Sequence, residues 1–503
     1  MKVLKKIFTR FNITIVLMAV QAVVYVTLIN RFVYFIPIIA LIGYVISIII
    51  ILRLVIKDEA AAVKIPWILV VSAMPILGTI LYFLFGSKHL SRKIKKRLAK
   101  ENALTVKHLP TNCSLQNSRE EGCLKYIRKT SLYPAYANTE TKYYPLGVLM
   151  FEDMLAEMAK AKKFIFLEYF IIEEGQMWNR LYELLLQKAE EGVEIKLIFD
   201  DFVSQRLFTS TFESTLWTKK IKTVRFNPIS PLFRPFMNHR DHRKLLLIDG
   251  HTGFTGAVNI IDDSIQPSEK FGVWKDTGIR LKGDGVWSFT LMFIEIWNCF
   301  CKPNELIQDY TTYNNTEVFA TDGLVQPYGD SPFLSERIGE NVYIDILNHA
   351  KDYVYIFTPF LIISEKMIYA LQMAARRGVD VRIVLPGKYD WMRAIAQRVS
   401  RSYYKYLLNV GIKIYENPTG YLHAKNFVCD DEIGIVGTIN LDYRSLYLHF
   451  ECAALLYQTS TIQALKQDAI KTMEAGGEVK HDGSGHIGST FIDVIIHLFA
   501  PIM

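Results

Sequence analysis

Two stretches of the sequence repeat one spacing of residues that could act on a phosphate ester. Residues 241–259 read DHRKLLLIDGHTGFTGAVN, and residues 422–440 read LHAKNFVCDDEIGIVGTIN. Each has His, one residue, Lys, four residues, Asp, six residues, Gly, two residues and Asn. The repeated residues are His242, Lys244, Asp249 and Asn259 in the first stretch, and His423, Lys425, Asp430 and Asn440 in the second. Imidazole, ammonium and amide groups together can bind a phosphate and move protons.

The alternation of side chains along a strand orders the residues within each stretch. It places the His and the Lys on one face. The Asp has the opposite parity and stands at a turn signal, Asp249-Gly250 in one stretch and Asp430-Asp431 in the other. We therefore expect both aspartates to hold the turn rather than do chemistry. After the turn the chain returns, so the Asn comes back beside the His-Lys face as a neutral donor.

Two such His-Lys-Asn faces brought together could bind a phosphodiester and catalyse its cleavage. Ammonium and amide groups can neutralise the equatorial oxygens of the transition state. One imidazole can attack phosphorus while the other protonates the departing oxygen, so a covalent phospho-histidine forms and is then displaced by an incoming hydroxyl. The sequence offers no acidic cluster with metal-ligand spacing, so we expect neither a metal nor a cofactor.

Other charged residues near the motifs are candidates for supporting roles. A nucleophilic imidazole needs its far nitrogen held. Asp276 in GVWKDTGIRL and Glu451 in YLHFECAALL are predicted to orient the imidazoles, one in each half, unless they are surface carboxylates at strand ends. Arg240 and Arg444 could steer an anionic substrate or serve as solvated or ion-paired structural residues.

The elements around the motifs indicate an α/β fold made of two similar halves. Apolar runs at 164–172 and 195–201, and again at 354–363 and 381–386, alternate with helix-like stretches. This pattern predicts buried parallel strands joined by helical crossovers. We expect two βαβ-type halves, residues 125–320 and 321–503, that meet about a pseudo-twofold axis, so that the twin motifs face each other. The apolar tail at the end of the second half, STFIDVIIHLFAPIM, is predicted to cap the core or to contact the membrane interface.

The front of the chain, residues 1–100, is a candidate membrane anchor. Segments 11–30, 32–52 and 65–86 contain no charged side chain, and each is roughly long enough to cross a bilayer. Basic residues lie at the amino terminus and in a run within 88–100, and both groups favour the cytoplasmic side. Three spans would put these two groups on opposite sides of the membrane. We expect two full spans, 32–52 and 65–86, preceding a catalytic domain on the cytoplasmic side of the cell membrane. The first segment then lies in the interface or re-enters, or the terminus crosses despite its charge; a cleaved signal peptide is disfavoured because no small-residue cleavage site follows it.

Composition sets outer bounds on the protein. The chain has 503 residues and a net charge of +8, which suits anionic lipid headgroups as well as nucleic acid. Its six cysteines form no CxxC pair, so we expect reduced thiols in structural positions. The polar stretch 101–124 is predicted to be a linker.

The two motifs resemble those of the phospholipase D superfamily. Within it, NHRDHRKLLLIDG, NLDYRSLYLHFE and PWILVVSAMPILGTILYFLFG resemble bacterial cardiolipin synthases. The resemblance implies a duplicated phospholipase D-like fold preceded by transmembrane helices. It implies that His242 is the nucleophile and His423 the acid and base. It implies phosphate contacts from Lys244, Asn259, Lys425 and Asn440, and structural parts for Asp249 and Asp430.

The same resemblance implies a reaction, in which two phosphatidylglycerol molecules give cardiolipin and glycerol. Its partners would be anionic phospholipids and the membrane, with no nucleic acid; the oligomeric state stays open. The alternatives are a membrane-bound phosphodiesterase that hydrolyses phospholipid or nucleic acid, and a lipid-binding protein without catalysis. Two residues depart from the family pattern: Ala257 stands where Gly or Ser is usual, and Gly278 where many relatives carry His.

Overall fold

The chain forms two compact units, Met1–Ser87 and Lys88–Met503. The structure, a computed structural model, describes residues 10–57, 61–86, 92–110, 122–228, 239–314, 317–319, 322–334, 336–417 and 420–480, and the single residues 496, 498 and 500. The apolar tail at the carboxyl end falls outside these ranges, apart from those three positions.

Helices make up the described part of the first unit. They are α2 (Arg10–Ile56), α3 (Ala61–Ala73), α4 (Pro75–Leu81) and the π-helical turn η1 (Tyr82–Gly86). Segments 11–30 and 32–52, predicted as separate, are parts of the single helix α2. The predicted span 65–86 is interrupted at Met74, because Pro75 has no N–H and disfavours helical backbone in the residue before it.

One helical stretch of this unit, Pro37–Ile56, is long and apolar enough to cross a membrane. The helices that follow it are apolar but shorter. By length and composition, the described residues therefore contain one such helix where the sequence predicted two spans.

The first half of the second unit is built on a seven-stranded sheet with the order β1-β9-β7-β6-β2-β3-β4. Its strands are β1 (Thr139–Tyr144), β2 (Phe164–Tyr169), β3 (Glu194–Asp200), β4 (Ile221–Phe226), β6 (Lys244–Ile248), β7 (Thr252–Gly256) and β9 (Gly278–Gly283). Strands β2, β3 and β4 pair in parallel, and the others pair antiparallel. The apolar run that gives β2 is buried along its whole length, as expected for a strand covered on both faces.

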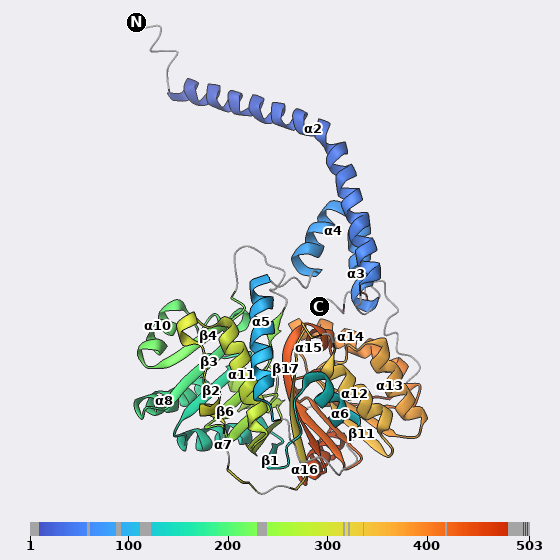
Figure 1. Ribbon diagram of the computed structural model, residues 1–503. Helices are drawn as coiled ribbons and strands as arrows, with labels where there is room; N and C mark the ends of the chain where they lie inside the picture. The colour runs from blue at the N-terminus through green and yellow to red at the C-terminus, as the bar shows by residue number, and fades with distance from the viewer. Residues whose placement is uncertain are drawn as a thin grey trace. The chain divides into compact units, whose positions relative to one another are not determined.

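The second half repeats this topology in a sheet with the order β10-β17-β16-β15-β11-β12-β13-β18. Its strands are β10 (Leu324–Asp330), β11 (Tyr353–Phe357), β12 (Asp380–Pro386), β13 (Lys413–Asn417), β15 (Asn426–Cys429), β16 (Ile433–Gly437), β17 (His449–Tyr457) and β18 (Gly477–Glu478). Strands β11, β12 and β13 are the parallel set. Apart from the added β18, the order matches the first sheet strand for strand, which confirms the predicted duplicated α/β fold (Figure 1).

Helices lie around the two sheets (Figure 1). Those before and within the first half are α5 (Arg92–Thr105), α6 (Gly122–Ser131), α7 (Gly147–Ala159), α8 (Gln176–Glu190), α9 (Asp201–Ser204), α10 (Ser210–Thr218) and α11 (Val286–Phe300). Those of the second half are α12 (Ile338–His349), α13 (Glu365–Arg376), α14 (Trp391–Leu408), α15 (Tyr443–Tyr447) and α16 (Thr461–Ala475). Short 3-10 turns are η2 (Val106–His108), η4 (Asp262–Ser264), η5 (Pro303–Glu305) and η6 (Thr311–Tyr313).

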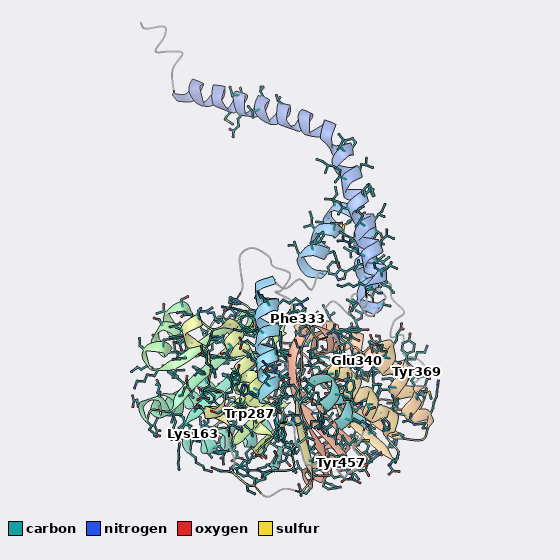
Figure 2. The ribbon with its side chains drawn as sticks, viewed as in Figure 1. Lys163, Trp287, Phe333, Glu340, Tyr369 and Tyr457 are labelled. Atoms are coloured by element: carbon teal, nitrogen blue, oxygen red, sulfur yellow. The ribbon has the colours of Figure 1, made fainter. Side chains whose placement is uncertain are left out.

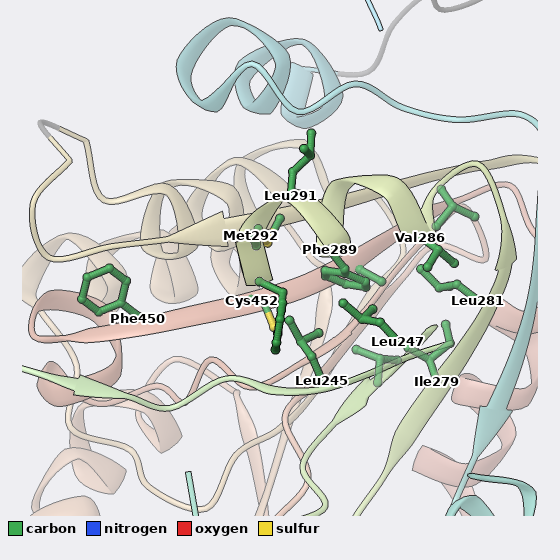
Figure 3. Packing of buried hydrophobic residues seen from close by; sticks show 14 of the residues in the cluster. Leu245, Leu247, Ile279, Leu281, Val286, Phe289, Leu291, Met292, Phe450 and Cys452 are labelled. Carbon is green, nitrogen blue, oxygen red and sulfur yellow. The ribbon is translucent and has the colours of Figure 1, made fainter. Parts of the chain in front are cut away.

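The largest hydrophobic core joins the halves around α11. This helix is apolar on all sides and almost wholly buried, which is typical of a core helix. Figure 3 shows its side chains beside residues of β6 and β9 from the first sheet and of β17 from the second. In Figure 2, Trp287 of α11 lies between Lys163 of the first half and Tyr457 of the second.

Part of the predicted linker 101–124 is ordered helix. Helix α5 runs to Thr105, and its Leu98 belongs to the core that contains α11. At the other end of the stretch, Cys123 and Leu124 are buried in α6. Residues 111–121 lie outside the described ranges.

Candidate active site

Each motif histidine follows a short strand that pairs with the opposite half. Strand β5 (Arg240–Asp241) runs parallel to the start of β17, and β14 (Gly420–Leu422) runs parallel to β8 (Val273–Lys275). The pairing continues into the histidines themselves. The N–H of His242 donates to the carbonyl of Phe450 over 2.9 Å, and the N–H of His423 donates to the carbonyl of Lys275 over 2.9 Å. The two histidines are therefore placed by the same inter-half contact, used twice.

The side chains of these histidines bond to carboxylates that also come from the opposite half. Nδ1 of His242 lies 2.8 Å from Oε1 of Glu451, and Nδ1 of His423 lies 2.7 Å from Oδ1 of Asp276. An ionised carboxylate only accepts, so Nδ1 carries the proton and Nε2 keeps its lone pair. The sequence placed one carboxylate in each half, and the structure joins each one to the histidine of the other half.

Each carboxylate is held a second time by a hydroxyl group. Thr438 Oγ1 donates to Oε2 of Glu451. In the first half the position matching Thr438 is Ala257, which has no hydroxyl, and Ser264 Oγ donates to Oδ2 of Asp276 over 2.6 Å instead. Sequence reasoning missed both hydroxyls, because neither belongs to the repeated motif.

The motif lysines are buried beside the histidines. Lys244 Nζ donates to the carbonyl of His242 over 2.6 Å, and Lys425 Nζ donates to the carbonyl of His423. Burial lowers the pKa of Lys244 to about 8. Burial, and next the charge of Lys244, lower the pKa of Lys425 well below its ordinary value. The two ammonium groups, one from each motif, therefore lie close enough to repel each other.

Burial and the motif lysines also lower the pKa values of the two imidazoles. Burial lowers the pKa of His242 well below its ordinary value, and Lys244, Lys425 and His423 lower it further. Burial and then Lys425 lower the pKa of His423 to about 3, although Asp276 opposes them. The lowered pKa values of both imidazoles thus favour their neutral form in this site.

The motif asparagines are buried and keep unused polar atoms. Asn259 and Asn440 are buried, and among the described residues their Oδ1 atoms accept no hydrogen bond. Nδ2 of Asn440 donates to Asp442 over 2.9 Å. Amide groups in this state can donate to or accept from a substrate that enters the site.

The motif aspartates bind backbone N–H groups of a neighbouring strand. Asp249 accepts from the backbone N–H groups of three successive residues at the start of β2, Lys162, Lys163 and Phe164, over 2.7 to 2.9 Å. Asp430 makes the matching bonds at the start of β11, over 2.7 to 3.0 Å. Both aspartates have φ of 52° at the hairpin turn. They tie each motif hairpin to the neighbouring strand.

The remaining candidate residues have mixed surroundings. Arg240 Nη1 lies 3.4 Å from Asp200, whereas Arg444 is exposed. His449, for which the sequence favours a surface or core role, lies buried beside His242, with 5.5 Å between the ring centroids. A Cβ at Gly278 would meet Sδ of Met150, so that flexible side chain would have to shift to admit a larger residue.

Comparisons with known proteins find similar chains. The family model described as cardiolipin synthase, PLD-like domain, matches residues 154–277 and 343–473, and a phospholipase D-nuclease N-terminal model matches residues 43–87. A cardiolipin synthase of Alkalihalophilus pseudofirmus is 30% identical over 421 residues, covering 82% of this chain and 83% of that protein. An uncharacterised protein of Streptococcus mutans is 41% identical over 448 residues, covering 87% of this chain and 96% of its own length.

A solved structure is similar in fold. The phosphatidylserine synthase of Haemophilus influenzae has a TM-score of 0.57 at 13% identity, covering 76% of this chain and 98% of that one. This likeness supports the fold alone.

Proposed function

This chain belongs to the cardiolipin synthase family with phospholipase D-like domains, and from that membership we propose the reaction it performs. It transfers a phosphatidyl group from one phosphatidylglycerol to another, giving cardiolipin and glycerol. The observation that carries the proposal is the crossed pairing of each motif histidine with a carboxylate of the opposite half. Such pairing provides two imidazoles with the same tautomer, each with Nε2 free for a substrate.

The first chemical step uses His242 as the nucleophile. Its Nε2 attacks phosphorus of the donor lipid, a P–N bond forms, and the bond from phosphorus to the glycerol oxygen breaks. His423 takes up a proton from solvent at Nε2 when the anionic phosphodiester is bound, and it donates this proton to the departing oxygen, so glycerol leaves as a neutral alcohol. Its buried partner Asp276 favours the protonated imidazole, and the anionic phosphodiester adds to this effect.

The second step reverses the proton transfer. His423 takes the proton from a hydroxyl of the acceptor lipid, whose oxygen then displaces His242 from phosphorus. Lys244, Lys425, Asn259 and Asn440 contact the non-bridging oxygens in both steps. Their burial and the mutual repulsion of the ammonium groups support this role, since an anion between them relieves the repulsion.

We further propose that the protein works at the surface of the cell membrane, with its second unit on the cytoplasmic side. The stretch Pro37–Ile56 has the length and composition of a span. The basic run within residues 88–100 favours the cytoplasm. An acceptor delivered in the plane of the same membrane has an effective concentration that helps it to compete with water.

Product analysis tests this function. Full-length protein is incubated with phosphatidylglycerol labelled in the headgroup glycerol and in an acyl chain. We expect labelled cardiolipin and free glycerol. Phosphatidic acid with glycerol would show a hydrolase instead, and the absence of any product would exclude both activities.

A further inference from the structure

A third potential metal ligand lies beside the pair formed by His242 and Glu451. His449 is 8% exposed, and neither of its ring nitrogens has a hydrogen-bond partner among the described residues. Its Nδ1 lies 3.7 Å from Oε1 of Glu451, which is too far for a hydrogen bond. Buried polar atoms without a partner are rare in folded proteins and call for a ligand or another explanation.

This arrangement occurs on one side of the pseudo-twofold axis only. The inter-half ladder that pairs Arg240 with His449 has a counterpart that pairs Tyr421 with Trp274. An indole ring is not a metal ligand. The dyad of His423 and Asp276 therefore has no third donor at the matching position.

We infer that His242, His449 and Glu451 form an inhibitory binding site for a transition-metal ion of the zinc type. One donor atom from each residue lies within 4.8 Å of the other two. Zinc holds nitrogen and oxygen ligands at about 2.0–2.2 Å in a tetrahedron, which puts any two of them about 3.3 Å apart. The separations of 2.8 Å and 3.7 Å from Glu451 Oε1 to the two Nδ1 atoms lie on either side of that value.

The charges around the site limit its affinity. Imidazoles bind metals in the neutral form and add no charge of their own. Glu451 contributes one negative charge, and Lys244 nearby opposes the dication. We therefore expect weaker binding than at a closed site with four protein ligands.

Occupation of the site would stop the reaction through the tautomer of His242. In the metal-free protein Nδ1 carries the ring proton and donates it to Glu451. A metal bound at Nδ1 takes that position, and the proton of the neutral ring moves to Nε2. A protonated Nε2 has no lone pair for attack on phosphorus or for accepting a proton. The inhibition therefore holds whichever of these steps His242 performs.

Metal titration of the full-length protein tests the inference. Activity is measured after removal of metals with EDTA, and then against free Zn²⁺ in a metal buffer, each protein being normalised to its own metal-free rate. We expect Zn²⁺ to inhibit the wild type and Mg²⁺ to have no such effect, since Mg²⁺ prefers oxygen ligands. His449→Asn should raise the inhibitory Zn²⁺ concentration by about tenfold or more. The matched control is His349→Asn, which removes a surface histidine 3.4 Å from Asp345 and should leave inhibition unchanged.

Binding is also read without turnover, which separates this inference from the proposed reaction. Co²⁺ should give visible absorption bands of tetrahedral coordination in the wild type and in His349→Asn, and these bands should be lost in His449→Asn. His449→Gln serves the same purpose if the Asn variant does not fold. Equal Zn²⁺ inhibition of the wild type and the His449 variants, or identical Co²⁺ spectra, would overturn the inference, as would a wild type that Zn²⁺ does not inhibit.

Discussion

A carboxylate behind each imidazole decides which ring nitrogen faces the substrate. Glu451 and Asp276 accept from Nδ1, so Nε2 of His242 and of His423 is left for the reaction that we propose. Sequence spacing identified the histidines, but it could not give their tautomers. The tautomer follows from a contact between residues 209 positions apart in one case and 147 in the other.

Replacement of either histidine tests the pair. His242→Asn and His423→Asn should each lower kcat by about 10³-fold or more, because each removes a group that forms or protonates a bond in the transition state. Rates of labelled cardiolipin formation give the measurement. His251→Asn is the control, since His251 contacts Thr252 and is not one of the repeated motif residues. Retained activity in both motif variants would contradict the mechanism.

Lysine protonation predicts an alkaline limit to activity. The pKa of Lys244, about 8 because of burial, means that this cation is present below pH 8 and is lost as the pH rises. Phosphate binding weakens with it, so kcat/KM for phosphatidylglycerol should fall as the pH rises through about 8. Lys244→Arg keeps its charge at higher pH, so its slower reaction should lack that fall. An unchanged profile in the Arg variant would assign the limit to another group.

At the scale of elements, hairpins and short strands deliver the side chains to the site. The motif hairpins are fixed by Asp249 and Asp430, and the inter-half strands β5 and β14 bring in the histidines. The predicted structural part of the aspartates rested on parity, turn signals and the family resemblance. In the structure, each aspartate faces the neighbouring strand and accepts hydrogen bonds from three backbone N–H groups there.

Removal of one such carboxylate should reduce stability more than catalysis. Asp249→Asn replaces an acceptor oxygen by an NH₂ group that faces backbone donors. We expect the free energy of unfolding to fall by about 2–4 kcal/mol, since hydrogen bonds to charged groups are stronger than those between neutral groups. Denaturant unfolding in detergent measures this change. A loss of kcat per folded molecule as large as that of His242→Asn would show that the carboxylate takes part in the reaction.

The hydroxyl groups behind the carboxylates offer a rescue experiment. Ser264→Ala leaves Asp276 without its second donor, so we expect kcat to fall about tenfold and the pH profile to shift. Ala257→Ser places a hydroxyl at the position that Thr438 occupies in the other half. Combined with Ser264→Ala, it should restore part of the lost rate. If Ser264→Ala were harmless, Asp276 would not need the second bond.

Local patterns in the sequence predicted much of this fold, and they failed where contacts are long-range. The apolar runs and the repeated spacing gave the α/β class and the duplication, because both depend on residues close in sequence. Ser264 was missed because only the folded chain brings it to Asp276. The break at Met74 was missed, although Pro75 signals it, because the prediction of a single span over 65–86 rested on the length of the apolar segment.

At the scale of the whole molecule, the second unit holds all the proposed chemistry, and the first is apolar helix. The core around α11 and the crossed carboxylates make the two halves of the second unit one catalytic body. The first unit, Met1–Ser87, contributes none of the site residues. We propose that it keeps the enzyme at the membrane that holds its substrates.

Deletion of residues 1–87 tests this division of labour. Cardiolipin formation on phosphatidylglycerol vesicles should fall about tenfold or more, because the acceptor is no longer concentrated around the site. Activity on a short-chain phosphatidylglycerol below its micelle concentration should stay near that of the full chain. Equal losses on both substrates would mean that the first unit supports the fold of the second.

The crossed pairing of histidine and carboxylate also constrains how such a chain can evolve. A single-copy ancestor with this wiring would have been active only as a homodimer, since each copy would have borrowed its partner's carboxylate. After fusion of the two copies, a substitution that moves the carboxylate of one half changes the position of the imidazole in the other half. Chimaeras that exchange one half between relatives should therefore work only when the donor brings a compatible partner for both rings.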